Sequence, residues 1–220
     1  MLLAGIVSGD DNSRTANIIN SIFTAAGRKV SILDSKILNE LKQNQIKDYM
    51  KELEKNNVDI LILKINFSDL NNSAFESLNF DIMVYNDKAD YIKVANVNND
   101  QAALEKAKTL LDEKGIVIVN IDDKELIRLL QGMKYYVVTY GFNSKASMTT
   151  SSVGDILDKD SFMCCLQRTI SATNGQTIEP QEYKLRIEAT GMDVYNVLAA
   201  AAFAVVNGID LSGVEQLTLV

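Results

Sequence analysis

Short runs of β-branched and other apolar residues alternate with amphipathic segments over the first part of the chain. Such runs are typical of strands buried on both faces of a parallel sheet, and the segments between them have the apolar spacing of helices. The expected strands are Leu2–Val7, Val30–Leu33, Val58–Leu63, Phe80–Tyr85, Ile116–Val119 and Tyr135–Tyr140. The expected helices are Asn17–Ala26 with Gly27 as C-cap, Lys36–Lys55, Gln101–Glu113 and Lys124–Leu130. Repeated strand–helix–strand units predict an α/β fold with a mostly parallel sheet flanked by helices.

The pattern changes after Gly141. Strand-like stretches separated by turn residues predict a small antiparallel sub-sheet over about residues 145–190. These stretches are Ser147–Leu157, Ser161–Ser171 and Tyr183–Glu188, and they are followed by an expected helix over Asp193–Val206 and a short one from Ser212. Because the sequence holds no linker and no repeat, we expect residues 1–220 to form a single domain.

Composition excludes several classes of function. The chain holds 22 Lys and Arg against 29 Asp and Glu, a net charge of −7, so we expect no binding to nucleic-acid phosphates. It has no His, which excludes Ser-His-Asp and Cys-His catalysis and His-based metal sites. Its two cysteines, Cys164 and Cys165, are neighbours in an expected strand, so we expect one in the core and one at the surface.

No segment of the sequence is suited to cross a membrane. The first strand, Leu2–Val7, lacks the positive residues that precede the apolar core of a signal peptide. The longest apolar stretch, Val194–Val206, is interrupted by Tyr195 and Asn196 and is too short for a bilayer. We therefore expect a cytoplasmic protein without membrane insertion.

The loop after the first strand is a candidate phosphate site. In α/β sheets such a loop leads into a helix whose free N–H groups favour an anion. We therefore expect the sheet to resemble that of P-loop proteins. A working P-loop has Gly for close backbone approach, Lys on the terminal phosphates, and Ser or Thr on magnesium. Gly9 and Thr15 are present, but the Lys is absent, and Ser13 or Arg14 takes its place.

Two interpretations of this loop stay open. Asp10 and Asp11 place negative charge where a polyphosphate would lie, which weakens nucleotide binding. The loop residues Asp10–Ser13 then simply cap the following helix. The alternative is weak nucleotide binding through Arg14 and Thr15.

Polar residues also follow the expected strand Ile116–Val119. Asn120, Asp122 and Asp123 stand at its carboxyl end, which is the edge of such a sheet where ligands bind. The alternative is a turn followed by a helix N-cap. Lys108 lies among other charges on an expected helix, where spacing alone predicts a solvated lysine.

In their order, these segments resemble the central ATPase domain of the Mur ligases, the ATP-dependent amino-acid ligases of peptidoglycan precursor synthesis. The resemblance extends over nearly all of the chain, and the order and spacing of the motifs carry it. The matching segments are Ala25–Val30, Phe80–Asn86, the pair Ala107 and Lys108, the N-x-D-D of Asn120, Asp122 and Asp123, Val137–Gly141, and Gly191, Asn196, Ala199 and Ala200.

The resemblance implies a nucleotide site for ATP and Mg²⁺. Its residues would be Gly9, Asn12, Ser13, Arg14, Thr15, Asn120, Asp122 and Asp123. The departures fall on the chemistry: the phosphate-binding Lys is absent, Lys64 stands where a Glu helps to hold magnesium, and no His follows Asn86. We therefore expect a vestigial site without catalytic residues. We expect no metal either, unless Lys108 is carbamylated, as the matching lysine is in several members of the family.

Two functions stay open. The first is a pseudoenzyme that has lost ATP-dependent ligation, needs no cofactor, and acts as a binding, scaffold or regulatory protein in peptidoglycan processes, with a protein partner or as a homo-oligomer. Since Met1 directly precedes the first strand and the chain stops at Val220, we expect the family's N-terminal and C-terminal domains to be absent. The second function is an ATP-binding component of an amide-forming ligase, with ATP and Mg²⁺ as cofactors and a partner that supplies those domains.

Overall fold

The computed structural model describes most of the chain. It leaves out residues 9–12, 39–40, 42, 67–68, 71–74, 76–77, 87–108, 130–133, 156–157, 189–192, 215 and 219–220. The chain divides into two compact units. The first is built from Met1–Asn12, Lys29–Val117 and Asp123–Val137, and the second from Ser13–Arg28, Ile118–Asp122 and Val138–Val220.

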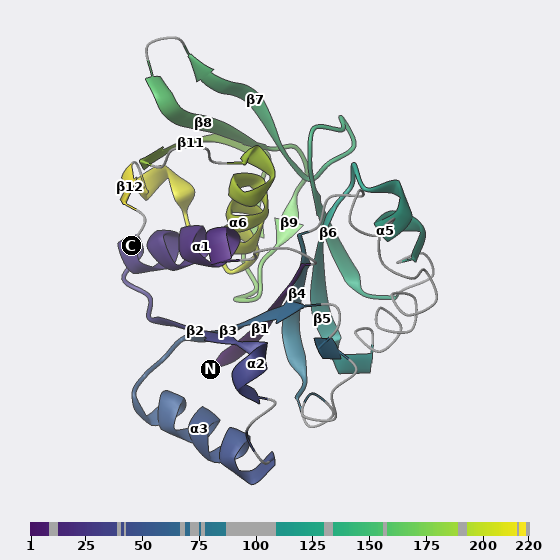
Figure 1. Ribbon diagram of the computed structural model, residues 1–220. Helices are drawn as coiled ribbons and strands as arrows, with labels where there is room; N and C mark the ends of the chain where they lie inside the picture. Colours follow the sequence, from purple (N-terminus) through teal and green to yellow (C-terminus); the bar gives the residue numbers. More distant parts are fainter. Residues whose placement is uncertain are drawn as a thin grey trace. The chain divides into compact units, whose positions relative to one another are not determined.

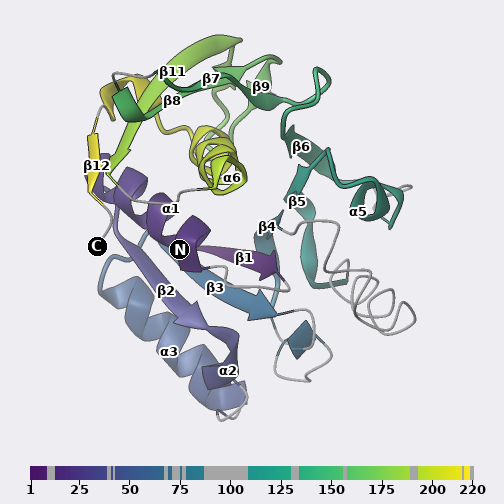
Figure 2. The same ribbon diagram turned by 45° about the horizontal axis from the view of Figure 1, so that its top comes forward.

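The first unit contains a parallel sheet with helices. Its elements are β1 (Leu2–Ser8), β2 (Val30–Asp34), α2 (Ser35–Leu38), α3 (Gln43–Lys55), β3 (Ile60–Asn66), β4 (Phe80–Tyr85), most of β5 (Leu111–Asn120), α5 (Lys124–Leu129) and the start of β6 (Tyr136–Tyr140). The strand order is β5–β4–β1–β3–β2. Strand β1 pairs in parallel with β3 and β4, and β2 pairs in parallel with β3. Figure 2 shows β1, β2 and β3 pointing the same way.

Strand β1 lies between β3 and β4, and its side chains are buried on both faces from Leu3 onward. Gly5 lies in the middle of this strand, and a Cβ added there would be 2.6 Å from Sδ of Met83 and 3.0 Å from Cδ1 of Ile65. The neighbouring side chains therefore pack directly against the bare backbone of β1. This cover on both faces explains why the first apolar run has no alternating polar positions.

The second unit combines two long helices with mainly antiparallel strands. Its elements are α1 (Ser13–Ala25), the end of β6, β7 (Met148–Asp155), β8 (Asp158–Leu166), β9 (Ile170–Ser171), β10 (Thr177–Ile178), β11 (Gln181–Glu188), α6 (Val194–Val206), η3 (Leu211–Gly213) and β12 (Gln216–Thr218). The strand order is β12–β11–β8–β7–β6. The β7–β8 and β8–β11 pairs are antiparallel, whereas β11–β12 and β6–β7 are parallel. Strands β9 and β10 form a separate sheet.

Helix α6 is the most buried element of the second unit. All of its residues from Val197 to Val206 are buried. Helix α1 packs beside it, and β7 and β8 lie against it (Figure 1). Phe23 of α1 and Phe203 of α6 have ring centroids 5.7 Å apart. A helix that is apolar on all sides is stable only when it is covered on all sides, and these neighbours provide that cover.

Both long helices of the second unit have a capping residue at one end, and the sequence predicts the cap at Gly27. Gly27 has φ +72°, and the N–H of Arg28 donates to the carbonyl of Phe23 at 2.8 Å, as in a Schellman motif. Asp193 caps α6 by accepting a hydrogen bond from the N–H of Tyr195 at 3.0 Å. Gly27 as the C-cap and Asp193 at the start of the last long helix are therefore confirmed.

The predicted fold class is confirmed. The parallel strands fall where the apolar runs are, and β7, β8 and β11 form the antiparallel part within residues 145–190. The two-residue strands β9 and β10 add a hairpin between β8 and β11.

Two predicted helices have wrong limits. The stretch Lys36–Lys55 contains two helices, α2 and α3, with a bend at Leu41 between them. The sequence of residues 39–42 holds one apolar residue and therefore offers no apolar stripe to bury. The helix predicted over Gln101–Glu113 cannot include Leu111–Glu113, which begin β5, and residues 101–108 lie outside the described part.

No helix that the structure describes is long and apolar enough to cross a membrane.

Two predictions in the second unit are also wrong, and one strand was missed. Ser161–Ser171 is not one strand, because after β8 the N–H of Gln167 donates to the carbonyl of Ser147 at 2.8 Å and β9 pairs separately with β10. The sequence did not predict β12, whose three residues are too few to show a period. Cys165 is buried rather than exposed, because Glu182 of the neighbouring strand lies against it, with Oε1 3.5 Å from Sγ.

We predict that Gly5→Ala destabilises the protein. The added methyl group would overlap the side chains of Met83 and Ile65, and overpacking of this kind costs about 1–3 kcal/mol. Urea unfolding measures the effect, with Gly213→Ala as the control because nothing lies within 4 Å of a Cβ at that position. Equal free energies of unfolding for the two variants would contradict the prediction.

We predict that the free energy of unfolding falls as the pH rises above 9. Burial raises the pKa of the Cys164 thiol from 9.0 to about 12, and burial also raises the pKa of the Tyr85 hydroxyl. At high pH the unfolded chain releases protons that the folded chain keeps, so each group lowers stability by up to about 1.4 kcal/mol per pH unit. Urea unfolding at a series of alkaline pH values checks this. Cys164→Ala should show a shallower fall than the wild type, and parallel curves would contradict the role of the thiol.

Candidate functional site

The first turn of α1 carries three of the predicted nucleotide-site residues. Ser13 is half-buried, Arg14 is exposed and Thr15 is buried. The Thr15 hydroxyl donates a hydrogen bond to Oδ1 of Asn196 at 3.0 Å. Because Asn196 lies in the first turn of α6, this bond connects the beginnings of the two long helices of the second unit.

Three other predicted residues lie outside the described part of the chain. These are Gly9 and Asn12 of the loop, together with Lys108. In the part of the chain that the structure does describe, no three His, Cys, Asp or Glu side chains gather as a metal-binding group. The roles expected for the three residues stay predictions.

Asp122 is the centre of a hydrogen-bond cluster in the second unit. Its Oδ2 accepts from the N–H of Phe142 at 2.6 Å and from the hydroxyl of Tyr195 at 3.3 Å. Its Oδ1 accepts from the N–H of Asn143 at 3.1 Å. Its own N–H donates to Oδ1 of Asn120 at 3.0 Å. The carboxylate therefore holds together the end of β5, the turn after β6 and the first turn of α6.

Gly141 allows the turn after β6 to approach this carboxylate. Its φ is +145°, a backbone conformation that side chains disfavour. A Cβ at this position would also lie 2.5 Å from Oδ2 of Asp122 and 3.2 Å from Oδ1 of Asn120. The side chains of Asn120 and Asp122 in the N-x-D-D motif therefore leave room only for a glycine at position 141.

An aromatic pair lies next to the Asp122 carboxylate. Phe142 and Tyr195 meet edge to face with 5.1 Å between ring centroids, and Phe142 is 50% exposed. Burial raises the pKa of Tyr195, and the negative charges of Asp122 and Asp193 raise it further. The hydroxyl therefore stays protonated at neutral pH and can donate to Asp122.

Asp123 has a different role from Asp122. It is buried in the first unit, where its Oδ1 accepts from the N–H of Leu126 at 2.9 Å and its carbonyl accepts from the N–H of Ile127 at 3.0 Å. Asp123 is thus the N-cap of α5. The turn-and-cap interpretation describes this segment, and a role for Asn120, Asp122 and Asp123 in nucleotide binding stays a prediction.

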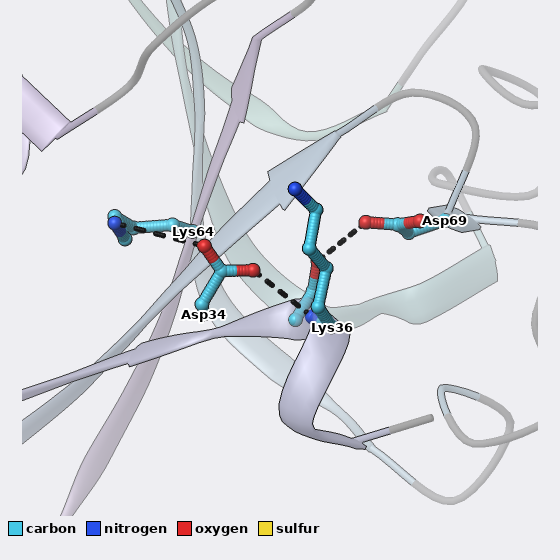
Figure 3. A network of polar contacts seen from close by, with 5 residues as sticks. Asp34, Lys36, Lys64 and Asp69 are labelled. Atoms are coloured by element: carbon cyan, nitrogen blue, oxygen red, sulfur yellow. Dashed lines mark hydrogen bonds and ion pairs between the residues drawn. The ribbon is translucent and has the colours of Figure 1, made fainter. Parts of the chain in front are cut away.

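Lys64 lies in the first unit at the carboxyl end of β3, beside an acidic partner (Figure 3). Its Nζ is 3.7 Å from Oδ2 of Asp34, which ends the neighbouring strand β2. The other oxygen of Asp34 accepts from the N–H of Lys36 at 3.0 Å. Next to this pair, the Ser35 hydroxyl donates to Asp69 at 2.7 Å. We call these four residues, Asp34, Ser35, Lys64 and Asp69, the strand-end network.

Sequence reasoning missed the acidic partners of Lys64 and the aromatic partners of Asp122. A signal for Asp34 was present, because it directly follows the expected strand Val30–Leu33 and parallel strands end at one edge. No comparable signal existed for Phe142 or Tyr195. They reach Asp122 from parts of the chain that are distant in sequence.

The comparison with protein families decides the membership of the chain. The model of the Mur ligase middle domain matches residues 13–204. The chain belongs to the Mur ligase family. The matched segment runs from the start of α1 to within two residues of the end of α6, so it includes both Thr15 and Asn196.

Solved structures show the same fold at low sequence identity. A UDP-N-acetylmuramoyl-L-alanyl-D-glutamate–2,6-diaminopimelate ligase has a TM-score of 0.72 and 13% identity, covering 97% of this chain and 45% of its own. The MurF ligase from Thermotoga maritima in complex with ADP has a TM-score of 0.62 and 14% identity, covering 100% of this chain and 49% of its own. A bifunctional folylpolyglutamate synthase/dihydrofolate synthase with Mn, AMPPNP and L-glutamate bound has a TM-score of 0.59 and 9% identity, covering 97% and 57%.

These similarities have a clear limit. The Mur ligase middle-domain chain spans about half the length of these three solved proteins, between 45% and 57%. No curated protein matches its sequence. At such identities the solved structures establish the shared fold, and the activities of the longer proteins do not transfer with it.

We predict that Asp122→Asn destabilises the protein more than Tyr195→Phe does. The amide cannot replace the carboxylate as an acceptor on both sides, and losing hydrogen bonds to a charged group costs about 1.5–3 kcal/mol. Tyr195→Phe removes one bond of 3.3 Å and should cost about 0.5–1.5 kcal/mol. Urea unfolding at neutral pH compares the two. A larger loss for Tyr195→Phe would show that the aromatic pair, and not the carboxylate, holds the cluster.

Proposed function

We propose that this Mur ligase middle domain has lost ATP-dependent ligation and acts as a binding, scaffold or regulatory protein in peptidoglycan processes. Its expected partner is another protein or a second copy of the chain, and its expected location is the cytoplasm. Membership of a family of cell-wall ligases supports the link to peptidoglycan. The departures from the family's chemistry support the loss of ligation.

The bond between Thr15 and Asn196 carries this proposal. In a working P-loop the Ser or Thr at the start of the helix places its hydroxyl on magnesium, and the Lys before it binds the terminal phosphates. Here the Thr15 hydroxyl is buried and donates to Asn196 at 3.0 Å. No Lys is present among Ser8–Thr15. The start of α1 therefore contributes to the packing of its own unit in place of holding a metal–nucleotide complex.

Charge supports the same conclusion. Asp10 and Asp11 bring two negative charges into the loop that would have to surround a polyphosphate, within a chain whose net charge is already −7. Like charges within a few ångströms of each other oppose binding, and without the Lys no ammonium group of the loop offsets them. The loop therefore favours a capped helix start over a phosphate cradle.

The second candidate function is an ATP-binding component of an amide-forming ligase. Arg14, exposed on the first turn of α1, supports it as a cation that would replace the missing Lys. The related MurF ligase from Thermotoga maritima was solved with ADP, so the shared fold can hold a nucleotide. In this case a partner protein would supply the domains that the longer relatives have.

We predict that isothermal titration calorimetry of the wild-type protein with millimolar Mg-ATP gives no binding heat. Thr15→Ala should lower the free energy of unfolding by about 1 kcal/mol, because Asn196 loses its donor. Thr24→Ala is the matched control, since Thr24 is exposed on the same helix.

Two outcomes would reverse the proposal. ATP hydrolysis or amino-acid ligation that disappears in Thr15→Ala but persists in Thr24→Ala would restore an enzymatic role for α1. Binding heat that is lost in Arg14→Ala, without turnover, would favour the ATP-binding component instead. Light scattering completes the test, because a homo-oligomer predicts a mass above the 24.3 kDa of one chain.

A further inference from the structure

The strand-end network brings a positive side chain to the carboxyl end of β3. Lys64 is mostly buried, with 21% of its side chain exposed, and Asp34 is 39% exposed. Figure 3 shows the Lys64 ammonium and the Asp34 carboxylate directed toward each other across the ends of β3 and β2. Their atoms Nζ and Oδ2 are 3.7 Å apart.

The backbone keeps the carboxylate in place. The N–H of Lys36 donates to Oδ1 of Asp34 at 3.0 Å, which leaves Oδ2 directed to Lys64. The following residue, Ser35, is buried and its hydroxyl donates to Asp69 at 2.7 Å. The junction of β2 and α2 is therefore fixed on both sides of the ion pair, and the pair does not depend on two freely moving side chains.

A divalent metal ion does not fit this set of groups. Mg²⁺ and Mn²⁺ need oxygen ligands with free lone pairs, and an ammonium group has three donors and no acceptor. A second positive charge beside Lys64 would also be repelled. The resemblance to the Mur ligases places a magnesium-holding Glu at Lys64, and the related folylpolyglutamate synthase/dihydrofolate synthase was solved with Mn bound. This chain has the opposite charge at that position.

We propose that the Lys64 ammonium is a built-in positive charge that takes the place of a divalent metal ion at the carboxyl end of β3. In this protein the Asp34 carboxylate has its counter-ion supplied by the chain itself, so the ends of β2 and β3 are held together at any metal concentration. The inference deepens the proposed function, and it rests on that function because it compares position 64 with the metal site of an active ligase. It is tested without nucleotide, so the two can fail separately.

Exchanging the charge at position 64 tests the proposal. Lys64→Glu would place a second carboxylate beside Asp34, which creates repulsion without metal and a pair of oxygen ligands for a metal. Lys64→Gln removes the positive charge and adds only a neutral amide oxygen, a weaker metal ligand than a carboxylate. The double variant Asp34→Lys/Lys64→Glu restores an ion pair with reversed polarity. Thermal unfolding of all four proteins is measured with EDTA and with millimolar MnCl2 or MgCl2.

The proposal expects a metal response in only one of the four proteins. The melting temperatures of the wild type, of Lys64→Gln and of the double variant should not change with metal. Lys64→Glu should melt lowest in EDTA and gain about 5 °C with Mn²⁺. If Lys64→Glu does not fold in EDTA, folding on addition of Mn²⁺ is the same result, read by circular dichroism.

Two results would overturn the proposal. The first is a rise in the melting temperature of the wild type with Mn²⁺ that disappears in Asp34→Asn, because the native groups would then hold a metal. The second is a Lys64→Glu protein that responds to metal no more than Lys64→Gln does, or that stays unfolded with metal while the double variant also fails to fold. A positive Mg-ATP titration with an unchanged metal response would reject the proposed loss of function and leave the role of Lys64 standing.

Discussion

Helix α6 must be covered on every side, and this requirement organises the second unit. From Val197 to Val206 it has no exposed position and no polar face. Each buried Val, Leu or Phe side chain of α6 contributes about 1.5–3 kcal/mol and each Ala less, so covering the helix stabilises the unit. Helix α1 covers it through Phe23 and Phe203, and β7 and β8 pack on it as well. Only its first turn carries polar groups.

The polar groups of that first turn fix how the covering elements meet. Asn196 accepts from Thr15 of α1, and Tyr195 donates to Asp122 at the end of β5. Asp193 caps the helix. Thr15 and Asp122, which the sequence predicts to belong to a nucleotide site, thus make internal hydrogen bonds in this chain.

The strand-end network shows the same principle in the first unit. Parallel strands bring their carboxyl ends to one edge, which collects charged side chains there whatever their role. In this chain the edge carries Lys64 and Asp34, which neutralise each other, with Asp69 bound to Ser35 nearby. An edge that satisfies its own charges is stable without a ligand.

The sequence by itself determined the fold class, most strands, the cap at Gly27, the start of the last long helix near Asp193, and the absence of His and of a P-loop Lys. These features are local. A strand buried on both faces, a helix end and the presence or absence of a residue type can each be recognised from a few neighbouring positions. Only the tertiary structure decided the strand β12, the burial of Cys165, and the partners of Lys64, Thr15 and Asp122. Each of those features depends on contacts between residues far apart in the chain, such as Thr15 and Asn196. The local sequence around one residue does not indicate which distant segment will contact it.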